Sequence, residues 1–168
     1  MTTVNPIERS DPLVVTDGSR VSRGAAAELT EAECLSLMGT ESIGRIAFVN
    51  AEGQQLVPVN FIVVDDLIYF RTSHDSLLSG FERGHDDVAF GIDHHDDSTR
   101  RGWNVTVHGH ARQVEDRANI NKILGDHRLA PWAGGVKPLV IEISPRCLAG
   151  RRVFQVNGSP QSAQGTGT

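Results

Sequence analysis

The sequence PVNFIVVDDLIYFRTSHDS, residues 58–76, has the pattern of two β-strands joined by a tight turn at Asp65-Asp66. The second strand brings Arg71, Thr72 and Ser73 to one end of this hairpin. Such groups hold phosphates, because the forked guanidinium supplies two parallel donors and the hydroxyls supply further ones. The hairpin therefore predicts a phosphate site at its rim.

Ser76 extends the same rim and begins a short helical pattern that includes Leu77, Leu78 and Phe81. Its hydroxyl, together with the N–H groups and the positive dipole end of the helix, would face the same anion. A solvated hairpin end followed by a helix cap has the same local pattern, since Ser, Thr and Asp are common at caps. The local sequence leaves both interpretations open.

Length and composition indicate one domain. The chain has 168 residues, of which 39% are hydrophobic, enough for a single core. Its formal charge of −5 argues against a nucleic-acid partner, because the phosphate backbone requires a basic surface. No apolar run approaches the roughly 20 residues that cross a bilayer, and the N-terminus lacks a signal-peptide core. We therefore expect a cytoplasmic protein without a membrane partner.

Several common classes of site are excluded by missing motifs. The two cysteines, Cys34 and Cys147, have no Cys-x-x-Cys spacing, which argues against a disulfide framework and a four-thiolate zinc site. The chain also lacks the phosphate-loop, Rossmann, zinc-protease and serine-esterase signatures. Nucleotide-hydrolysing enzymes, Rossmann enzymes, metalloproteases and esterases are therefore disfavoured.

Three regions are predicted along the chain. Residues 1–27 show no sustained hydrophobic period and are expected to form a flexible arm, or an arm that is ordered only against a partner subunit. Residues 28–156 are expected to form the folded domain. Residues 157–168 are mostly Gly, Ser, Gln and Thr, which predicts a disordered tail.

The domain has the pattern of a mainly β protein. Thr30 and Glu33 have capping-box spacing and start a helix, which Gly39 ends. From Ile43 the hydrophobic period changes to two, and Pro58, which lacks an N–H, requires an edge, a bulge or a cofactor-facing rim. Strands are expected at residues 43–50, 57–64, 67–72, 87–93, 103–115, 139–143 and 147–156, and helices at 77–83 and 116–124. These elements predict a mostly antiparallel barrel with a few helices.

Two groups of histidines are candidate metal ligands. His94 and His95 precede Asp96 and Asp97, but adjacent residues at a strand end point to opposite sides and cannot easily chelate one ion. A hydrated loop is the favoured interpretation. Residues 108 and 110 are both histidine and would share one strand face, where a solvent-facing stripe is favoured over a cofactor contact. We therefore predict no metal site.

Two tryptophans are candidates for contacts with a ligand or a second subunit. Trp103 begins the strand at 103–115, where its indole could pack on a cofactor ring, at an interface or in the core. Trp132 lies in the loop Pro131–Gly135, where an interface, a substrate contact or simple packing are all compatible with the sequence.

The order of six segments resembles that of the pyridoxamine 5′-phosphate oxidase-like flavoproteins, the FMN-binding split β-barrels. The resemblance runs from about Leu29 to Val153 and is carried by LTEAECL at 29–35, GRIAF at 44–48, VPVNF at 57–61, IYFRT at 68–72, VAFGID at 88–93 and GWNVTVHG at 102–109. It implies a split β-barrel and a flavin-dependent oxidoreductase that passes hydride or electrons to a small molecule. It also implies a homodimer, with FMN in the cleft between the two barrels.

The resemblance further implies which residues bind the cofactor. The strand residues Val57, Pro58, Val59, Asn60 and Phe61 would offer main-chain contacts to the flavin ring. Those expected to face the phosphate or ribityl chain, or to reach the ring from a later strand, are Arg71, Thr72, Ser73, Ser76, Trp103 and Asn104. The related deazaflavin coenzyme F-420 is the alternative cofactor.

The chain departs from the family at one informative place. The family commonly has a basic residue after the third strand that neutralises the phosphate, and the matching positions here are Leu77 and Leu78. Arg71 would then hold the phosphate alone unless Arg83, Arg100 or a partner's arginine substitutes. A competing hypothesis follows: a non-catalytic, stress-related barrel that has lost flavin, or that uses its histidines for haem or metal.

Overall fold

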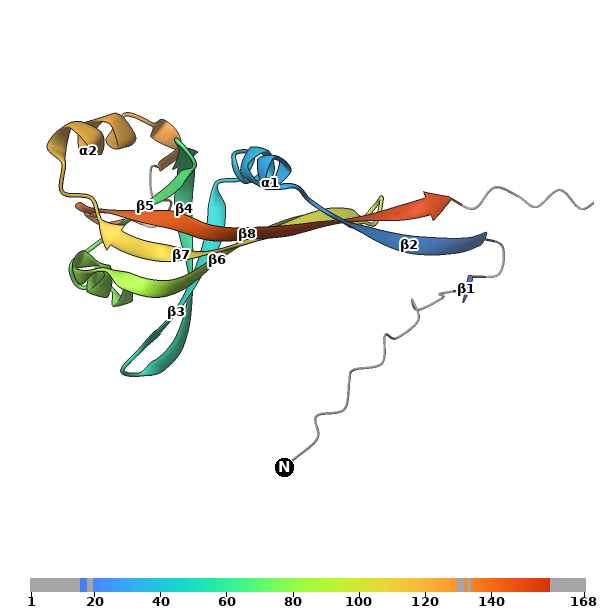
Figure 1. Cartoon of the computed structure of the whole chain (residues 1–168), viewed down its shortest axis with the longest axis horizontal. Coiled ribbons are helices and arrows are strands. Elements are labelled where there is room, and N and C mark those ends of the chain that lie inside the picture. Colours follow the sequence, from blue (N-terminus) through green and yellow to red (C-terminus); the bar gives the residue numbers. More distant parts are fainter. Residues whose placement is uncertain (1–15, 18–19, 130–131, 133, 158–168) are drawn as a thin grey trace, which may run out of the picture.

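The computed structural model describes residues 16–17, 20–129, 132 and 134–157. In this part of the chain eight strands form one sheet, ordered β1-β2-β8-β5-β4-β3-β6-β7, and every pairing is antiparallel. The strands are β1 (Thr16–Asp17), β2 (Arg20–Glu28), β3 (Ile43–Asn50), β4 (Gly53–Val64), β5 (Leu67–Thr72), β6 (His85–Asp96), β7 (Arg101–Gln113) and β8 (Leu139–Asn157). Because β7 also pairs with β8, the strands from β3 to β8 close into a barrel (Figure 1). The predicted mainly β, antiparallel split barrel is confirmed.

Strand β8 connects the barrel to a ribbon that extends beyond it (Figure 1). Its first residues pair with β5, its last residues pair with β2, and β7 runs beside it from Ile141 to Val153. The prediction of two separate strands around Pro145 was wrong. The proline is accommodated by a register shift between His108 and Gly109 of β7, which leaves the strand continuous.

The expected arm at residues 1–27 differs from the structure over its last part. Residues from Ser22 to Glu28 pair in register with β8, from Asn157 back to Arg151. Alanines occupy positions 25–27, so the segment has no hydrophobic alternation and only the uncovered edge of β8 makes it a strand. Residues 1–15 and 18–19 of the predicted arm and residues 158–168 of the predicted tail lie outside the described residues.

The caps and the tight turn that the sequence predicts are present in the structure. Helix α1 (Glu31–Met38) begins with the capping box: the Glu33 N–H donates to Thr30 Oγ1 at 3.3 Å, and the Thr30 N–H donates to Glu33 Oε2 at 2.9 Å. Asp65 and Asp66 form the β4–β5 turn with φ of 51° and 63°, as a two-residue hairpin turn requires. Helix α2 (Arg117–Leu124) starts after its N-cap Asp116.

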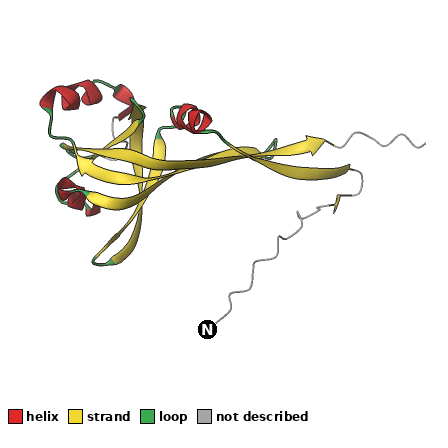
Figure 2. Ribbon diagram, viewed as in Figure 1, coloured by secondary structure: helices red, strands yellow, loops and turns green. Residues whose placement is uncertain are grey.

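The barrel interior is filled mainly by large aromatic and aliphatic side chains. Phe61 packs edge-on against Phe90 with ring centroids 5.1 Å apart, and Phe48 packs against Phe81 at 4.9 Å. Phe81 comes from the 3-10 helix η1 (Leu77–Arg83), which covers one end of the barrel core. A second apolar cluster lies under α2 and η2 (His127–Leu129), so the short helices cover the margins of the strands (Figure 2).

Candidate functional site

A cavity of about 400 Å³ lies between β4, β5, the start of η1 and the segment before β8. We call it the β4–β5 cavity. It brings together eight of the eleven residues predicted to bind a cofactor: Val57, Pro58, Val59, Asn60, Arg71, Thr72, Ser73 and Ser76. Leu77, Leu78, Leu129 and Lys137 complete its walls.

The cavity exists because β4 changes partners along its length. Residues 53–60 pair with β3, whereas the pairing with β5 begins only at Phe61. The Phe61 N–H donates to the Ser42 carbonyl at 3.1 Å, so by alternation the main-chain groups of Pro58 and Asn60 point away from β3. This edge is not paired with β5, which explains how the strand tolerates a proline and leaves main-chain acceptors and one N–H for a ligand.

Two cations lie on one wall of the cavity. Arg71 Nε and Nη2 donate to the main-chain carbonyl of Lys137 at 3.0 and 2.8 Å, which holds the guanidinium in place. Lys137 itself lines the cavity and forms no ion pair with any residue that the structure describes. Among the described lining residues none is Asp or Glu, so the cavity carries net positive charge. Both features favour an anionic ligand.

Lys137 was not found from the sequence. It lies 66 residues after Arg71 and carries no motif. The pairing of Thr72 with Leu139 brings the two cations to the same place, and that register is decided by the closure of the barrel. The alternation of side chains in residues 139–143 predicts a strand there, but it does not predict which strand pairs with it.

Hydroxyl groups line the same cavity. Thr72 Oγ1 and Ser76 Oγ form a short hydrogen bond of 2.5 Å, and Ser76 Oγ accepts the N–H of Leu78 at 3.1 Å. Asn60 Oδ1 accepts the N–H of Trp132 at 3.0 Å, which places Trp132 beside the cavity. The predicted hydroxyl rim and the helix cap are therefore both present, in the same residues.

Leu77 and Leu78 have different environments. Leu77 is 50% exposed and points to the cavity side of η1, whereas Leu78 is 4% exposed and belongs to the barrel core. Of the two positions at which the sequence lacks a cation, only Leu77 could carry one without burying a charge.

Three predicted cofactor residues are not in this cavity. Phe61 is 1% exposed and packs in the barrel core, so only its main chain lies near the site. Trp103 and Asn104 lie on the β6–β7 end of the ribbon and line other cavities. Their side chains point to opposite sheet faces because they are neighbours in one strand. Within one chain, Trp103 and Asn104 lie apart from Arg71 and Thr72, and their expected contact with a cofactor between two barrels stays a prediction.

The histidines do not form a metal centre. His94 and His95 lie in β6 rather than in a loop, and they pair with different residues of β7. His94 Nδ1 is 3.0 Å from Glu41 Oε1, and His110 Nδ1 is 3.1 Å from Asp86 Oδ1. No group of three His, Cys, Asp or Glu side chains among the described residues could hold a metal ion.

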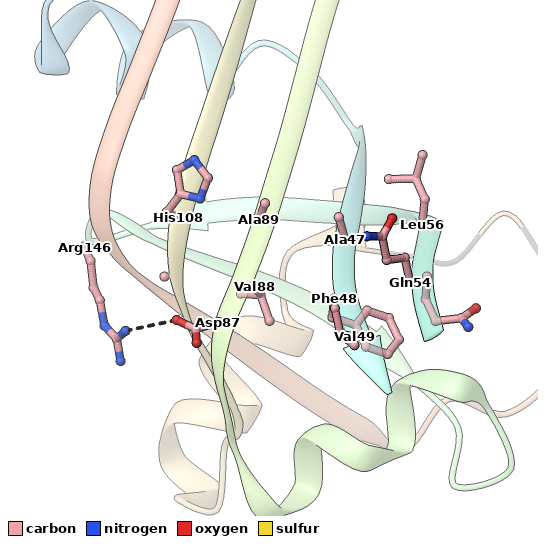
Figure 3. Close-up of a pocket in the computed structure, with 12 residues that line it drawn as sticks. Ala47, Phe48, Val49, Gln54, Leu56, Asp87, Val88, Ala89, His108 and Arg146 are labelled. Carbon is pink, nitrogen blue, oxygen red and sulfur yellow. Dashed lines mark ion pairs between the residues drawn. The ribbon is translucent and has the colours of Figure 1, made fainter. Parts of the chain in front are cut away.

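A larger depression of about 590 Å³ lies on the outer face of the sheet, between the β3–β4 hairpin and strands β6 to β8 (Figure 3). His108 and Arg146 line one side, and the exposed residues Val49 and Leu56 line the other. The Arg146 guanidinium lies 3.4 Å from Asp86 and 3.8 Å from Asp87, so its charge is offset in part by two exposed carboxylates. This surface is suited to an apolar contact rather than to an anion.

The chain is similar to known proteins in sequence and in fold. Residues 30–152 match the family model described as pyridoxamine 5′-phosphate oxidase. The uncharacterized protein Rv0080 of Mycobacterium tuberculosis is 30% identical over 137 residues, which cover 79% of this chain and 89% of that protein. Within the described part of the chain, no helix is long and apolar enough to span a membrane.

Two solved structures extend the comparison. A Corynebacterium glutamicum protein named "Putative pyridoxamine 5'-phosphate oxidase" has a TM-score of 0.65 and 28% identity, covering 79% of this chain and 96% of its own. The FAD binding protein of Mycobacterium smegmatis has a TM-score of 0.58 and 27% identity, covering 76% of this chain and 98% of its own. With the family match spanning most of the barrel, the chain belongs to the pyridoxamine 5′-phosphate oxidase family.

Proposed function

We propose that this chain is a flavin-dependent oxidoreductase that binds FMN in the β4–β5 cavity and acts on a small molecule. One observation carries the proposal: Arg71 and Lys137 share a wall with Thr72 and Ser76, beside the unpaired edge of β4 and with no described carboxylate in the lining. The similar M. smegmatis protein, an FAD binding protein, supports a flavin rather than another phosphate-bearing ligand.

The lining residues fit the two ends of a flavin. A phosphate would be held by Arg71 and Lys137, with hydrogen bonds from Ser73 and Ser76. The polar edge of the ring would meet the outward main-chain groups of Pro58 and Asn60, which need no particular side chain. A bound flavin would supply the hydride or electron chemistry, while the protein orients it and excludes water.

A homodimer is part of the proposal. Val49 and Leu56 are 60% and 66% exposed and lie beside the outer-face depression, next to the small residues Ala47 and Ala89 (Figure 3). An apolar sheet face of this kind favours a partner. Sedimentation at micromolar concentration is expected to show a dimer, and Leu56→Asp is expected to shift it towards monomer. A wild-type monomer under these conditions would contradict the dimer.

The flavin site is tested by the spectrum of the purified protein and by FMN titration. We expect flavin absorbance bands, and Arg71→Ala is expected to raise the dissociation constant for FMN more than about tenfold, because a charge-assisted hydrogen bond is lost. Arg83→Ala is the matched control, since Arg83 is exposed at the far end of η1 and does not line the cavity. Equal affinities of the two variants would contradict the site.

The same preparation separates the alternatives. Mass analysis of the released cofactor distinguishes FMN from the deazaflavin coenzyme F-420, which the two cations of the cavity also suit. A Soret band would indicate a haem protein. A bare protein spectrum that does not change on addition of FMN would favour the non-catalytic barrel, in which Leu77 stands where the family has a cation.

A further inference from the structure

A further cavity, of about 630 Å³, lies on the ribbon where β6, β7 and the end of β8 meet. We call it the Trp103 cavity. It shares no lining residue with the β4–β5 cavity. The residues that matter for its chemistry are His94, Thr99, Arg101, Trp103, Arg152 and Phe154.

An aromatic surface forms one part of this cavity. The rings of His94 and Trp103, from paired positions of β6 and β7, are inclined by only 16° with centroids 6.1 Å apart. His94 is held from outside the ribbon, because its Nδ1 lies 3.0 Å from Glu41 Oε1. Phe154 of β8 adds a third, partly exposed ring. Flat, half-exposed rings of this kind stack on planar ligands.

Two arginines border the aromatic surface. Arg152 is the cross-strand partner of Trp103, and Arg101 begins β7 two residues before it. Neither forms an ion pair within 4.0 Å with any residue that the structure describes. The cations are therefore available to an anion from solution, and their fork geometry suits a phosphate or carboxylate.

The carboxylates near the cavity have other hydrogen-bond partners. Asp96 accepts bonds from the main-chain N–H and hydroxyl groups of both Ser98 and Thr99. Glu33 of α1 accepts hydrogen bonds from the N–H and the hydroxyl of Thr30. The charge of Arg152 also lowers the pKa of Glu33, after these hydrogen bonds. Asp96 lines the cavity, but neither it nor Glu33 lies within 4.0 Å of the guanidinium groups of Arg101 or Arg152.

We propose that the Trp103 cavity binds a planar aromatic molecule that carries a phosphate or carboxylate group. The ring stacks on the aromatic surface of Trp103, and the anionic group is held by Arg101 and Arg152. The volume is in the range of small-ligand sites. Within one chain, its residues and its charges are separate from those around Arg71.

The test uses the full chain with Trp132→Phe, which leaves Trp103 as the one tryptophan. AMP and 2-naphthoate, two planar anions, are expected to quench its fluorescence saturably. Adenosine lacks the anionic group and inorganic phosphate lacks the planar ring, so both are expected to bind at least about tenfold more weakly.

Substitutions on one strand supply the matched comparison. Arg152→Gln is expected to weaken the binding of both planar anions at least about fivefold, since it removes one of the two cations. Arg151→Gln removes the same charge from the opposite face of β8 and is expected to change neither affinity. Melting temperatures of both variants confirm that the fold is retained.

Three results would overturn the proposal. The first is absence of saturable quenching by both AMP and 2-naphthoate. The second is equal weakening by Arg151→Gln and Arg152→Gln, which would indicate general charge attraction. The third is loss of the quenching in Arg71→Ala, which would place the probes in the β4–β5 cavity. If the proposal is right, this variant binds FMN more weakly and AMP as the wild type does.

Discussion

Arg71 and Lys137 are linked through the main chain, because two nitrogens of the Arg71 guanidinium, Nε and Nη2, donate to the Lys137 carbonyl at 3.0 and 2.8 Å. The bond joins the end of β5 to the segment that leads into β8. It also explains how a chain with leucines at the usual basic positions keeps two cations beside one cavity.

The first prediction concerns Lys137. Lys137→Gln is expected to weaken FMN binding by about tenfold to a hundredfold, because it removes one charge-assisted contact to the phosphate and leaves the main-chain carbonyl in place. Titration of flavin fluorescence measures the effect. Lys122→Gln is the control: its ammonium pairs with Asp65 on the exposed surface, 2.8 Å away, outside the cavity. A Lys137 variant with wild-type affinity would show that Arg71 acts alone.

The second prediction compares Leu77→Lys with Leu78→Lys. The first places an ammonium at a half-exposed position of the cavity wall and is expected to tighten FMN binding with little change in stability. The second buries a charge in the barrel core and is expected to cost about 2–5 kcal/mol of unfolding free energy. Paired FMN titrations and denaturant melts distinguish the two. If both variants melt like the wild type, the assignment of Leu78 to the core is wrong.

The third prediction concerns the close packing at Gly44. A Cβ on this residue would lie 2.3 Å from Cζ of Phe90, which is fully buried against Phe61. Gly44→Ala is therefore expected to lower the free energy of unfolding by about 1–3 kcal/mol. Gly91→Ala on the neighbouring strand is the control, since its nearest contact is 4.0 Å, and we expect it to be neutral. Urea denaturation measures both, and similar values for the two variants would contradict this account.

The fourth prediction concerns the contribution of Asp96 to stability at low pH. Hydrogen bonds from the side chains and then the main chain of Ser98 and Thr99 lower the pKa of Asp96 from 3.8 to about 2. A lowered folded-state pKa means that Asp96 stabilises the turn above pH 3.8 and that this contribution is lost as the pH falls through about 2. The difference in melting temperature between wild type and Asp96→Asn is thus expected to shrink between pH 4 and pH 2. A difference that is constant over this range would refute the prediction.

Much of the barrel could be predicted because its signals are local. The capping box at Thr30 and Glu33, the Asp65-Asp66 turn and the alternation along β4 each depend on neighbours in the chain. The same holds for the rim of Arg71, Thr72 and Ser76, which one hairpin and one helix start bring together. Local backbone preferences and hydrophobic period are sufficient for such elements.

The sequence by itself determined the antiparallel strands, the hydroxyl and guanidinium rim and the absence of a usual cation at Leu77. Only the tertiary structure decided that Lys137 lies beside Arg71, that residues 22–28 form a strand paired with β8, and that Trp103 lies in a separate cavity with Arg152. Each of these depends on which strands pair across long stretches of chain, and on their register. That choice comes from closing the barrel around one shared core, a property of all the strands together that no local pattern contains.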